Sequence, residues 1–241
     1  MKYIIILTFC LSWGAIAAPA DQVIHYEAAY MGIPLLDMTL TWVEDETSVQ
    51  ITYDNQLKPF IAFFHPIHNI YRVHFQRDSF APLDWSKTVS EGDMQFQLRA
   101  VRSSDGQKVI YSNGLSLDFP PGCMTIFSAT HFLASRAQDP GFFPVKFPVF
   151  IDGELWEAHA RRYTADNPHP DHTLVANQIL VQADLHYLSG KAIIDDNDIL
   201  TSVIATEGTR FLLWVAPDGN YTRAQFGNFP RAVVLKQIQN K

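Results

Sequence analysis

The sequence predicts a mainly β protein, built as a curved antiparallel sheet, half-barrel or barrel-like, with one principal α-helix packed on it. Three observations predict this fold. Apolar and polar residues alternate with a period of two over many short segments, as in half-buried strands. Turn dipeptides such as Asp152-Gly153 and Asp218-Gly219 separate those segments. A single stretch, residues 125–138, has its apolar residues at helical spacing.

The first half of the chain is predicted to form antiparallel strands joined by short turns. The polar connection 45–48 has the length of a hairpin loop, so the strands on either side of it should pair. Residues 57–74 are rich in aromatic side chains and are interrupted by Pro59 and Pro66, which predicts an irregular lid or short helix leading into a strand. The strands predicted in this half span residues 24–30, 36–43, 49–53, 70–75, 85–90, 94–102 and 108–112.

The second half begins with the predicted helix, which Asp139-Pro140-Gly141 should end. About a dozen strands with one helix must curl in order to cover their apolar surface and edges, and we expect the helix on the concave side. The strands predicted after the helix span residues 145–151, 155–163, 179–187, 200–206, 209–216, 221–226 and 232–239.

The N-terminal residues have the pattern of a cleavable secretory signal peptide. Lys2 supplies a positive charge, an apolar stretch follows, and residues 15–17 end in the small side chains that signal peptidase requires. We expect residues 1–17 to be removed, with cleavage after Ala20 as the second choice, and 18–241 to form a single domain. The apolar stretch is too short to span a bilayer, and no second long apolar run follows, so no membrane span is predicted.

Composition and charge narrow the possible partners. An apolar content of 47% with 13% aromatic residues is enough for one large core. The net charge of -7 speaks against nucleic-acid binding, which uses Lys and Arg patches, and against electrostatic attachment to an anionic membrane. One lipid held in an apolar cavity remains compatible with that charge. Removal of Cys10 with the signal peptide would leave Cys123 as the single thiol, which we expect to be buried because its neighbours are apolar.

Five short patterns along the chain support a resemblance to a known family. They are Tyr26-x-x-x-Tyr30-x-Gly32-Ile33-Pro34, Ala81-Pro82-Leu83 with Glu91-Gly92, the helix 128–136, Phe147-Pro148-Val149-x-x-Asp152-Gly153 and Trp214-Val215-Ala216-x-Asp218. Their order resembles the DUF3108 domain, a family of exported bacterial proteins of unknown function. The resemblance implies a periplasmic location in a Gram-negative cell and a curved β architecture similar to that of periplasmic lipoprotein carriers. It implies no catalytic residues, and we expect no cofactor.

Two polar segments could bind a metal ion. His169, Asp171 and His172 are ligand-type side chains close together in the loop 166–173, although the proline density there is typical of an ordinary exposed connection. Asp195-Asp196-Asn197-Asp198 offers oxygen ligands but lacks the Gly and Glu of an EF-hand loop, which favours a solvated turn. No metal site is assigned.

Ser128 and His131, with Cys123 just upstream, form the arrangement that comes nearest to a hydrolase site. A helix N-terminus could lower the pKa of the thiol, but an apolar helix docked on the sheet accounts for the same residues. No catalytic residue is therefore assigned.

The function that these observations favour is non-enzymatic binding or assembly in the cell envelope, with a lipid or other apolar ligand held on the concave sheet. Of Arg161 and Arg162 only one can line such a cavity, because neighbouring strand residues face opposite sides. The alternatives are a structural or interaction module that docks an envelope protein, and a hydrolase. The candidate ligand-binding residues are Phe60, Phe63, Phe64, Tyr71, Arg161 and Trp214.

Overall fold

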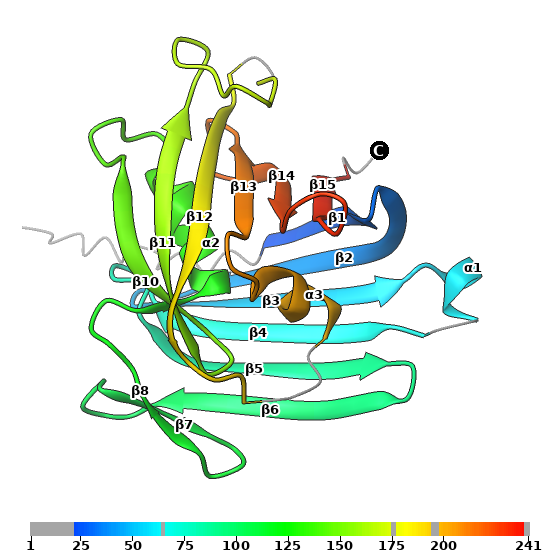
Figure 1. Ribbon diagram of the computed structural model, residues 1–241, viewed down its shortest axis with the longest axis vertical. Helices are drawn as coiled ribbons and strands as arrows, with labels where there is room; N and C mark the ends of the chain where they lie inside the picture. Colours follow the sequence, from blue (N-terminus) through cyan, green and yellow to red (C-terminus); the bar gives the residue numbers. More distant parts are fainter. Residues whose placement is uncertain (1–21, 64–65, 175–176, 194–197, 239–241) are drawn as a thin grey trace, which may run out of the picture.

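The computed structural model describes residues 22–63, 66–174, 177–193 and 198–238. Within these ranges the chain forms one 15-stranded sheet and three helices (Figure 1). The first group of elements is β1 (Gln22–Tyr30), β2 (Ile33–Glu44), β3 (Ser48–Leu57), α1 (Pro59–Ala62), β4 (His68–Gln76), β5 (Pro82–Glu91), β6 (Met94–Arg102), β7 (Lys108–Tyr111) and β8 (Ser116–Asp118). The second is β9 (Met124–Thr125), α2 (Ile126–Arg136), β10 (Val145–Ile151), β11 (Glu154–Tyr163), β12 (Ile179–Gly190), α3 (Ile199–Ile204), β13 (Arg210–Val215), β14 (Tyr221–Phe226) and β15 (Val233–Gln237).

The sheet has the order β8-β7-β6-β5-β4-β3-β2-β1-β15-β14-β13-β12-β11-β10-β9. Neighbouring strands are antiparallel except β9 and β10, which run parallel. The first strand therefore lies in the middle of the sheet, where Tyr26 pairs with Gln237 and Tyr30 with Val233 of the last strand. Figure 1 shows the β1–β8 half lying across the β9–β15 half, so that the sheet curls around an interior. This confirms the predicted curved, barrel-like β fold.

Helix α2 lies in that interior and packs against β4, β10 and β13, from both halves of the sheet. It begins in a capping box, in which Thr125 accepts a hydrogen bond from the amide of Ser128 and the Ser128 hydroxyl accepts one from the amide of Thr125. Its buried face includes Ala129 and Leu133, which belong to the main core. The predicted principal helix is thus confirmed, and it ends at Arg136 rather than at residue 138.

One predicted strand is wrong. Residues 200–206 lie largely in α3, a helix that begins after Asp198. The Asp198 carboxylate accepts a hydrogen bond from the amide of Thr201, which caps the first turn, and Val203 and Ile204 are buried. The β-branched residues of this segment favour a strand locally, but the cap and the contacts with the core decide the outcome.

Other differences are small. The short strands β8 and β9 were not predicted, since two or three residues give no readable alternation. Helix α1 and strand β4 confirm the short helix and following strand expected within 57–74. In the ranges that the structure describes, no helix has the length and apolar character needed to cross a bilayer. The predicted signal peptide and Cys10 lie outside those ranges.

Candidate functional site

An apolar cavity lies in the interior between the sheet, the N-terminal end of α2, and α3. Its walls include Met38 of β2, Phe127 of α2, Leu200 of α3 and Phe226 of β14. The cavity has a volume of about 50 Å³. An apolar cavity of about 150 Å³ is needed to hold a molecule the size of benzene. In this conformation the cavity is therefore too small for an acyl chain.

A second cavity of about 40 Å³ lies on the other side of the same side chains. Tyr71, Ile126, Phe127, Leu200 and Ile204 line both cavities. The two spaces are therefore separated by a thin partition to which α3 contributes two side chains. These two side chains, Leu200 and Ile204, are the part of the partition that belongs to α3.

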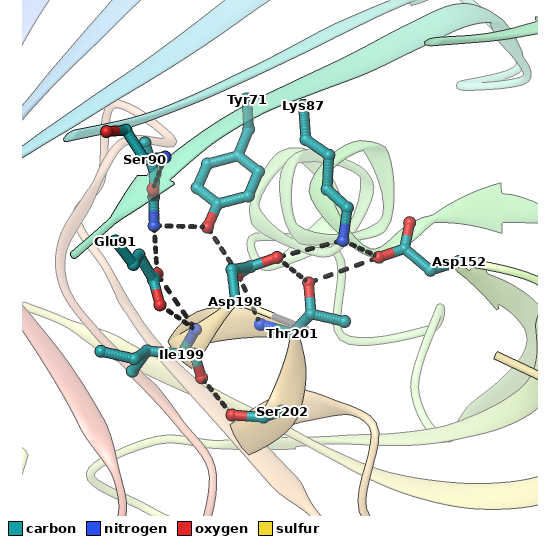
Figure 2. A network of polar contacts seen from close by, with 10 residues as sticks. Tyr71, Lys87, Ser90, Glu91, Asp152, Asp198, Ile199, Thr201 and Ser202 are labelled. Carbon is teal, nitrogen blue, oxygen red and sulfur yellow. Dashed lines mark hydrogen bonds and ion pairs between the residues drawn. The ribbon is translucent and has the colours of Figure 1, made fainter. Parts of the chain in front are cut away.

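The second cavity also borders a buried ion cluster, formed by Lys87, Asp152 and Asp198 (Figure 2). The Lys87 ammonium forms an ion pair with Asp152 and lies 3.1 Å from the Asp198 carboxylate. Lys87 is 5% exposed and Asp198 is 0% exposed. The three residues come from β5, from the turn between β10 and β11, and from the position that precedes α3. Separate parts of the chain thus converge on one ammonium group.

Asp198 ties α3 to the sheet through further hydrogen bonds. The Tyr71 hydroxyl donates to Asp198 at 2.6 Å, and the Thr201 hydroxyl donates to it at 2.8 Å. The Thr201 hydroxyl also lies 3.4 Å from Asp152. The Asp198 carboxylate therefore caps α3, accepts a hydrogen bond from Tyr71 of β4 and forms an ion pair with Lys87 of β5.

Glu91 forms a second connection between α3 and the sheet. Its carboxylate accepts a hydrogen bond from the backbone amide of Ile199 at 3.2 Å (Figure 2). It accepts another from the side-chain amide of Asn69. The side-chain oxygen Oδ1 of Asn69 in turn accepts a hydrogen bond from the backbone amide of Ser90 at 3.1 Å. Glu91, Asn69 and Tyr71 line the first cavity together with Asn55, so its mostly apolar wall carries one polar strip.

The charges of the cluster shift one another's pKa. For Asp198, burial favours the neutral form, but Lys87 and the hydrogen bonds from Tyr71 and Thr201 outweigh it and lower the pKa. For Asp152, burial outweighs the attraction of Lys87, and the pKa is raised. For Lys87, burial opposes the charged form, but the two carboxylates outweigh it and the pKa is raised. Asp152 is therefore the carboxylate of the cluster that takes up a proton most readily.

The candidate ligand-binding residues are dispersed in the structure. Tyr71 lines both cavities. Phe60 and Phe63 are exposed on α1 and at its C-terminal end, and Phe64 lies outside the described residues. Trp214 is buried with Leu180 and Leu212 on the face of the sheet opposite the interior.

The two arginines of β11 face opposite sides, as predicted, but Arg161 is on the outer one. Arg161 is exposed. Arg162 lies on the same face of β11 as the buried Ala158 and Ala160, and it donates a hydrogen bond to the carbonyl of Ala137 at 2.7 Å. The inner arginine is therefore already bound to the end of α2. Neither guanidinium reaches the cavities described above.

The proline-rich loop with His169, Asp171 and His172 packs over Trp214. The side chain of Gln182 is hydrogen-bonded to Nε2 of His169 at 2.7 Å, and the amide of Asp171 donates to Nδ1 at 3.0 Å. Both ring nitrogens of His169 are thus engaged, and the ring of His172 lies against Trp214. Across the described ranges, no three His, Cys, Asp or Glu side chains are grouped so as to hold a metal ion.

The residues considered for hydrolysis have separate surroundings. Cys123 is buried with Phe119 and Phe150, and burial raises its pKa to about 12. Ser128 is engaged in the capping box. His131 is hydrogen-bonded to the Tyr53 hydroxyl at 2.7 Å, and burial lowers its pKa to about 3. His131 also borders two open clefts of about 390 and 450 Å³ at the C-terminal end of α2.

The ion cluster was not predicted from the sequence, which favoured a solvated turn for Asp198. A signal was nevertheless present. Residues 85, 87, 89 and 91 lie on one side of a strand, and Trp85 and Val89 are apolar, so Lys87 and Glu91 belong to the side that faces the core. A lysine and a glutamate at core-facing positions of a strand indicate buried, paired charges.

Comparison with known proteins extends the finding on the fold. The chain is similar to a solved beta-barrel-like protein of a domain of unknown function, DUF1849, from Brucella abortus, with a TM-score of 0.50 and 9% sequence identity. The alignment covers 92% of this chain and 96% of that chain. Such a low identity shows the fold alone. No family model matches the sequence, so the resemblance to DUF3108 is not confirmed, and no curated protein matches it.

Proposed function

We propose that this chain is a non-enzymatic binding protein of the cell envelope, and that it holds an apolar ligand such as the acyl chain of a lipid between α2, α3 and the concave sheet. The observation that carries the proposal is the pair of adjacent interior cavities separated by side chains of α2, α3 and β4. The N-terminal signal pattern supports a periplasmic location.

The ligand enters by displacement of α3. This helix has six residues, and a helix of that length is not stable without external contacts. The contacts that hold it include the polar ones from Asp198 and Glu91. The surrounding strands, in contrast, are held by continuous ladders. Among the walls of the cavity, α3 therefore requires the fewest broken contacts to move.

The polar strip gives the bound ligand a fixed orientation. Asn69, Tyr71 and Glu91 lie on one side of the cavity, and the remaining wall is mostly apolar. Displacement of α3 removes the partners that Asp198 supplies to Tyr71 and that the amide of Ile199 supplies to Glu91. The head group of a ligand with an apolar chain would replace them, since buried polar groups need partners. This matches the usual form of a ligand site, in which a few polar groups orient a ligand within apolar walls.

The first test is solvent extraction and mass spectrometry of the protein purified from its own host. We expect a lipid or another apolar compound in near-stoichiometric amount. A second test titrates the purified protein with cis-parinaric acid, a fluorescent fatty acid. Leu200 lines both cavities, so the larger side chain of the variant Leu200→Trp should occupy cavity space that the ligand needs. We expect it to weaken binding by roughly tenfold or more, equivalent to about 1.4 kcal/mol.

The matched control is Leu188→Trp, because Leu188 is exposed on β12 and lines neither cavity. Its affinity for cis-parinaric acid should equal that of the unaltered protein. If the purified protein carries no apolar compound and does not bind the probe, the proposed function is wrong. If Leu200→Trp binds as well as the unaltered protein, the site has been placed incorrectly.

A further inference from the structure

Large apolar side chains are exposed at one end of the sheet. Phe60, Phe63 and Phe229 are 70%, 86% and 86% exposed, and Met31 and Ile33 are about half exposed, at 52% and 58%. We call these five residues the apolar rim. They lie on three separate segments, which are the β1–β2 turn, α1 with its C-terminal end, and the β14–β15 loop.

The pairing of the strands places these three segments at the same end of the sheet, where the strands begin or finish. Tyr30 pairs with Ile33 of β2 and with Val233 of β15, and Leu36 pairs with Leu57, which precedes α1. The β1–β2 turn, α1 and the β14–β15 loop therefore all lie at the same end of these strands. In Figure 1 the β1–β2 turn and α1 project beyond the sheet on the same side.

The first cavity lies at this same end of the strands, on the inner face of the sheet. Its lining includes Leu36 of β2, Ile67 just before β4, and Phe226 and Val233 on either side of the β14–β15 loop. Each of these residues is within a few positions of a member of the apolar rim. The rim therefore surrounds the end of the sheet at which the cavity lies.

We propose that the apolar rim inserts into the interfacial layer of a phospholipid bilayer and places the cavity against the membrane from which the ligand comes. This inference rests on the proposed function and names the source of its ligand. Aromatic side chains on separate projecting segments suit a bilayer, because each can enter the soft interface independently. A protein partner would instead need one continuous, complementary patch.

The charges near the rim define the kind of membrane. Arg231 is exposed two residues from Phe229, and Lys58, two residues before Phe60, is paired with Glu27. Among the residues that the structure describes, one exposed cation beside the rim is too few for electrostatic attachment in a protein of net charge -7. Binding is therefore driven by apolar insertion, extends to neutral phospholipid, and changes little with salt.

The test is flotation with phosphatidylcholine vesicles at low and high salt. We expect the chain without its signal peptide, residues 18–241, to float at both, and the same chain with Phe60→Ser/Phe63→Ser/Phe229→Ser to partition at least tenfold less. The matched control is Val101→Ser/Ile110→Ser, which removes exposed apolar side chains on β6 and β7 and should float like the unaltered protein.

A labelling measurement keeps the test independent of the stability of the triple variant. Because Cys123 is buried and its pKa is raised, Phe63→Cys can be labelled selectively with an environment-sensitive fluorophore. Its emission should shift to the blue when phosphatidylcholine vesicles are added, whereas labelled Ile110→Cys should not change.

The outcomes separate this inference from the proposed function. If the protein binds cis-parinaric acid in solution but does not float, the role of the rim is refuted and the proposed function stands. If it floats only with anionic vesicles at low salt, apolar insertion is refuted. If the triple variant keeps its affinity for the probe and loses flotation, both are supported.

Discussion

Replacement of Lys87 by methionine tests whether the buried ion cluster holds α3 in place. The substitution keeps an unbranched side chain but removes the positive charge next to Asp152 and Asp198. Both carboxylates then remain in the interior without their cation. We expect α3 to loosen and the whole protein to lose stability.

The size of the loss follows from the geometry. For unit charges 3.1 Å apart, as between Lys87 and Asp198, an effective dielectric constant of about 20 gives an attraction of about 5 kcal/mol. Asp198 keeps its hydrogen bonds from Tyr71 and Thr201, and Asp152 can take up a proton, which limits the cost. We therefore expect a loss of about 3 kcal/mol, at the lower end of the range for a broken buried ion pair.

The loss should depend on pH. Burial already raises the folded-state pKa of Asp152 above its unfolded value, and loss of Lys87 removes the charge that opposes this rise. The folded variant therefore recovers stability as pH falls and Asp152 binds a proton, by up to about 1.4 kcal/mol per pH unit in the window between its two pKa values. The deficit should be largest at neutral pH and smaller at pH 5.

Urea unfolding of the unaltered protein and of Lys87→Met at pH 7.5 and pH 5 measures the effect. The triple variant Lys87→Met/Asp152→Asn/Asp198→Asn removes all three charges and should recover much of the loss, because no unpaired charge remains. A loss below about 1 kcal/mol, or one that is equal at both pH values, would refute the reasoning.

Three further predictions concern other parts of the molecule. The pKa of His131 is lowered to about 3 by burial, so stability should fall as pH decreases from about 6.5, by about 2 kcal/mol at pH 5, and His131→Gln should remove that part of the decline in urea unfolding. Cys123 should resist iodoacetamide at pH 8 in the folded protein and react in urea; full labelling without urea would contradict its burial. Gly190→Ala should lower the free energy of unfolding by about 1–3 kcal/mol more than Gly219→Ala. Both glycines have positive φ, but a Cβ at Gly190 would collide with the backbone of Gly153, whereas none lies near Gly219. Equal losses would contradict this contact.

Most of the strands could be predicted because their alternation is local. Strands β6, β10 and β14 occupy the predicted residues, and the other strands from β1 to β7 and from β11 to β15 differ mainly at their ends. Helix α3 could not be predicted from its own residues, since its β-branched side chains favour a strand. What fixes it is the cap from Asp198 and the link to Glu91, more than 100 residues earlier in the chain.

The site was harder to predict than the fold. Lys87, Asp152 and Asp198 are separated by 65 and 46 positions in the sequence, and no short motif connects them. Asp152 precedes Gly153 in what looks like an ordinary tight turn. Only the curvature of the sheet brings this turn opposite β5, and curvature is a property of the assembled strands rather than of any segment.

The position of β1 beside β15 has a consequence for synthesis. Tyr26 and Gln237 are paired although they are 211 positions apart in the sequence (237 − 26). A nascent chain can form the meander from β1 to β8 early, but the free edge of β1 stays open until the last strand emerges. Closing so long a loop is slow, and an open edge invites pairing with other chains. Aggregation is therefore favoured in the interval before β15 reaches β1.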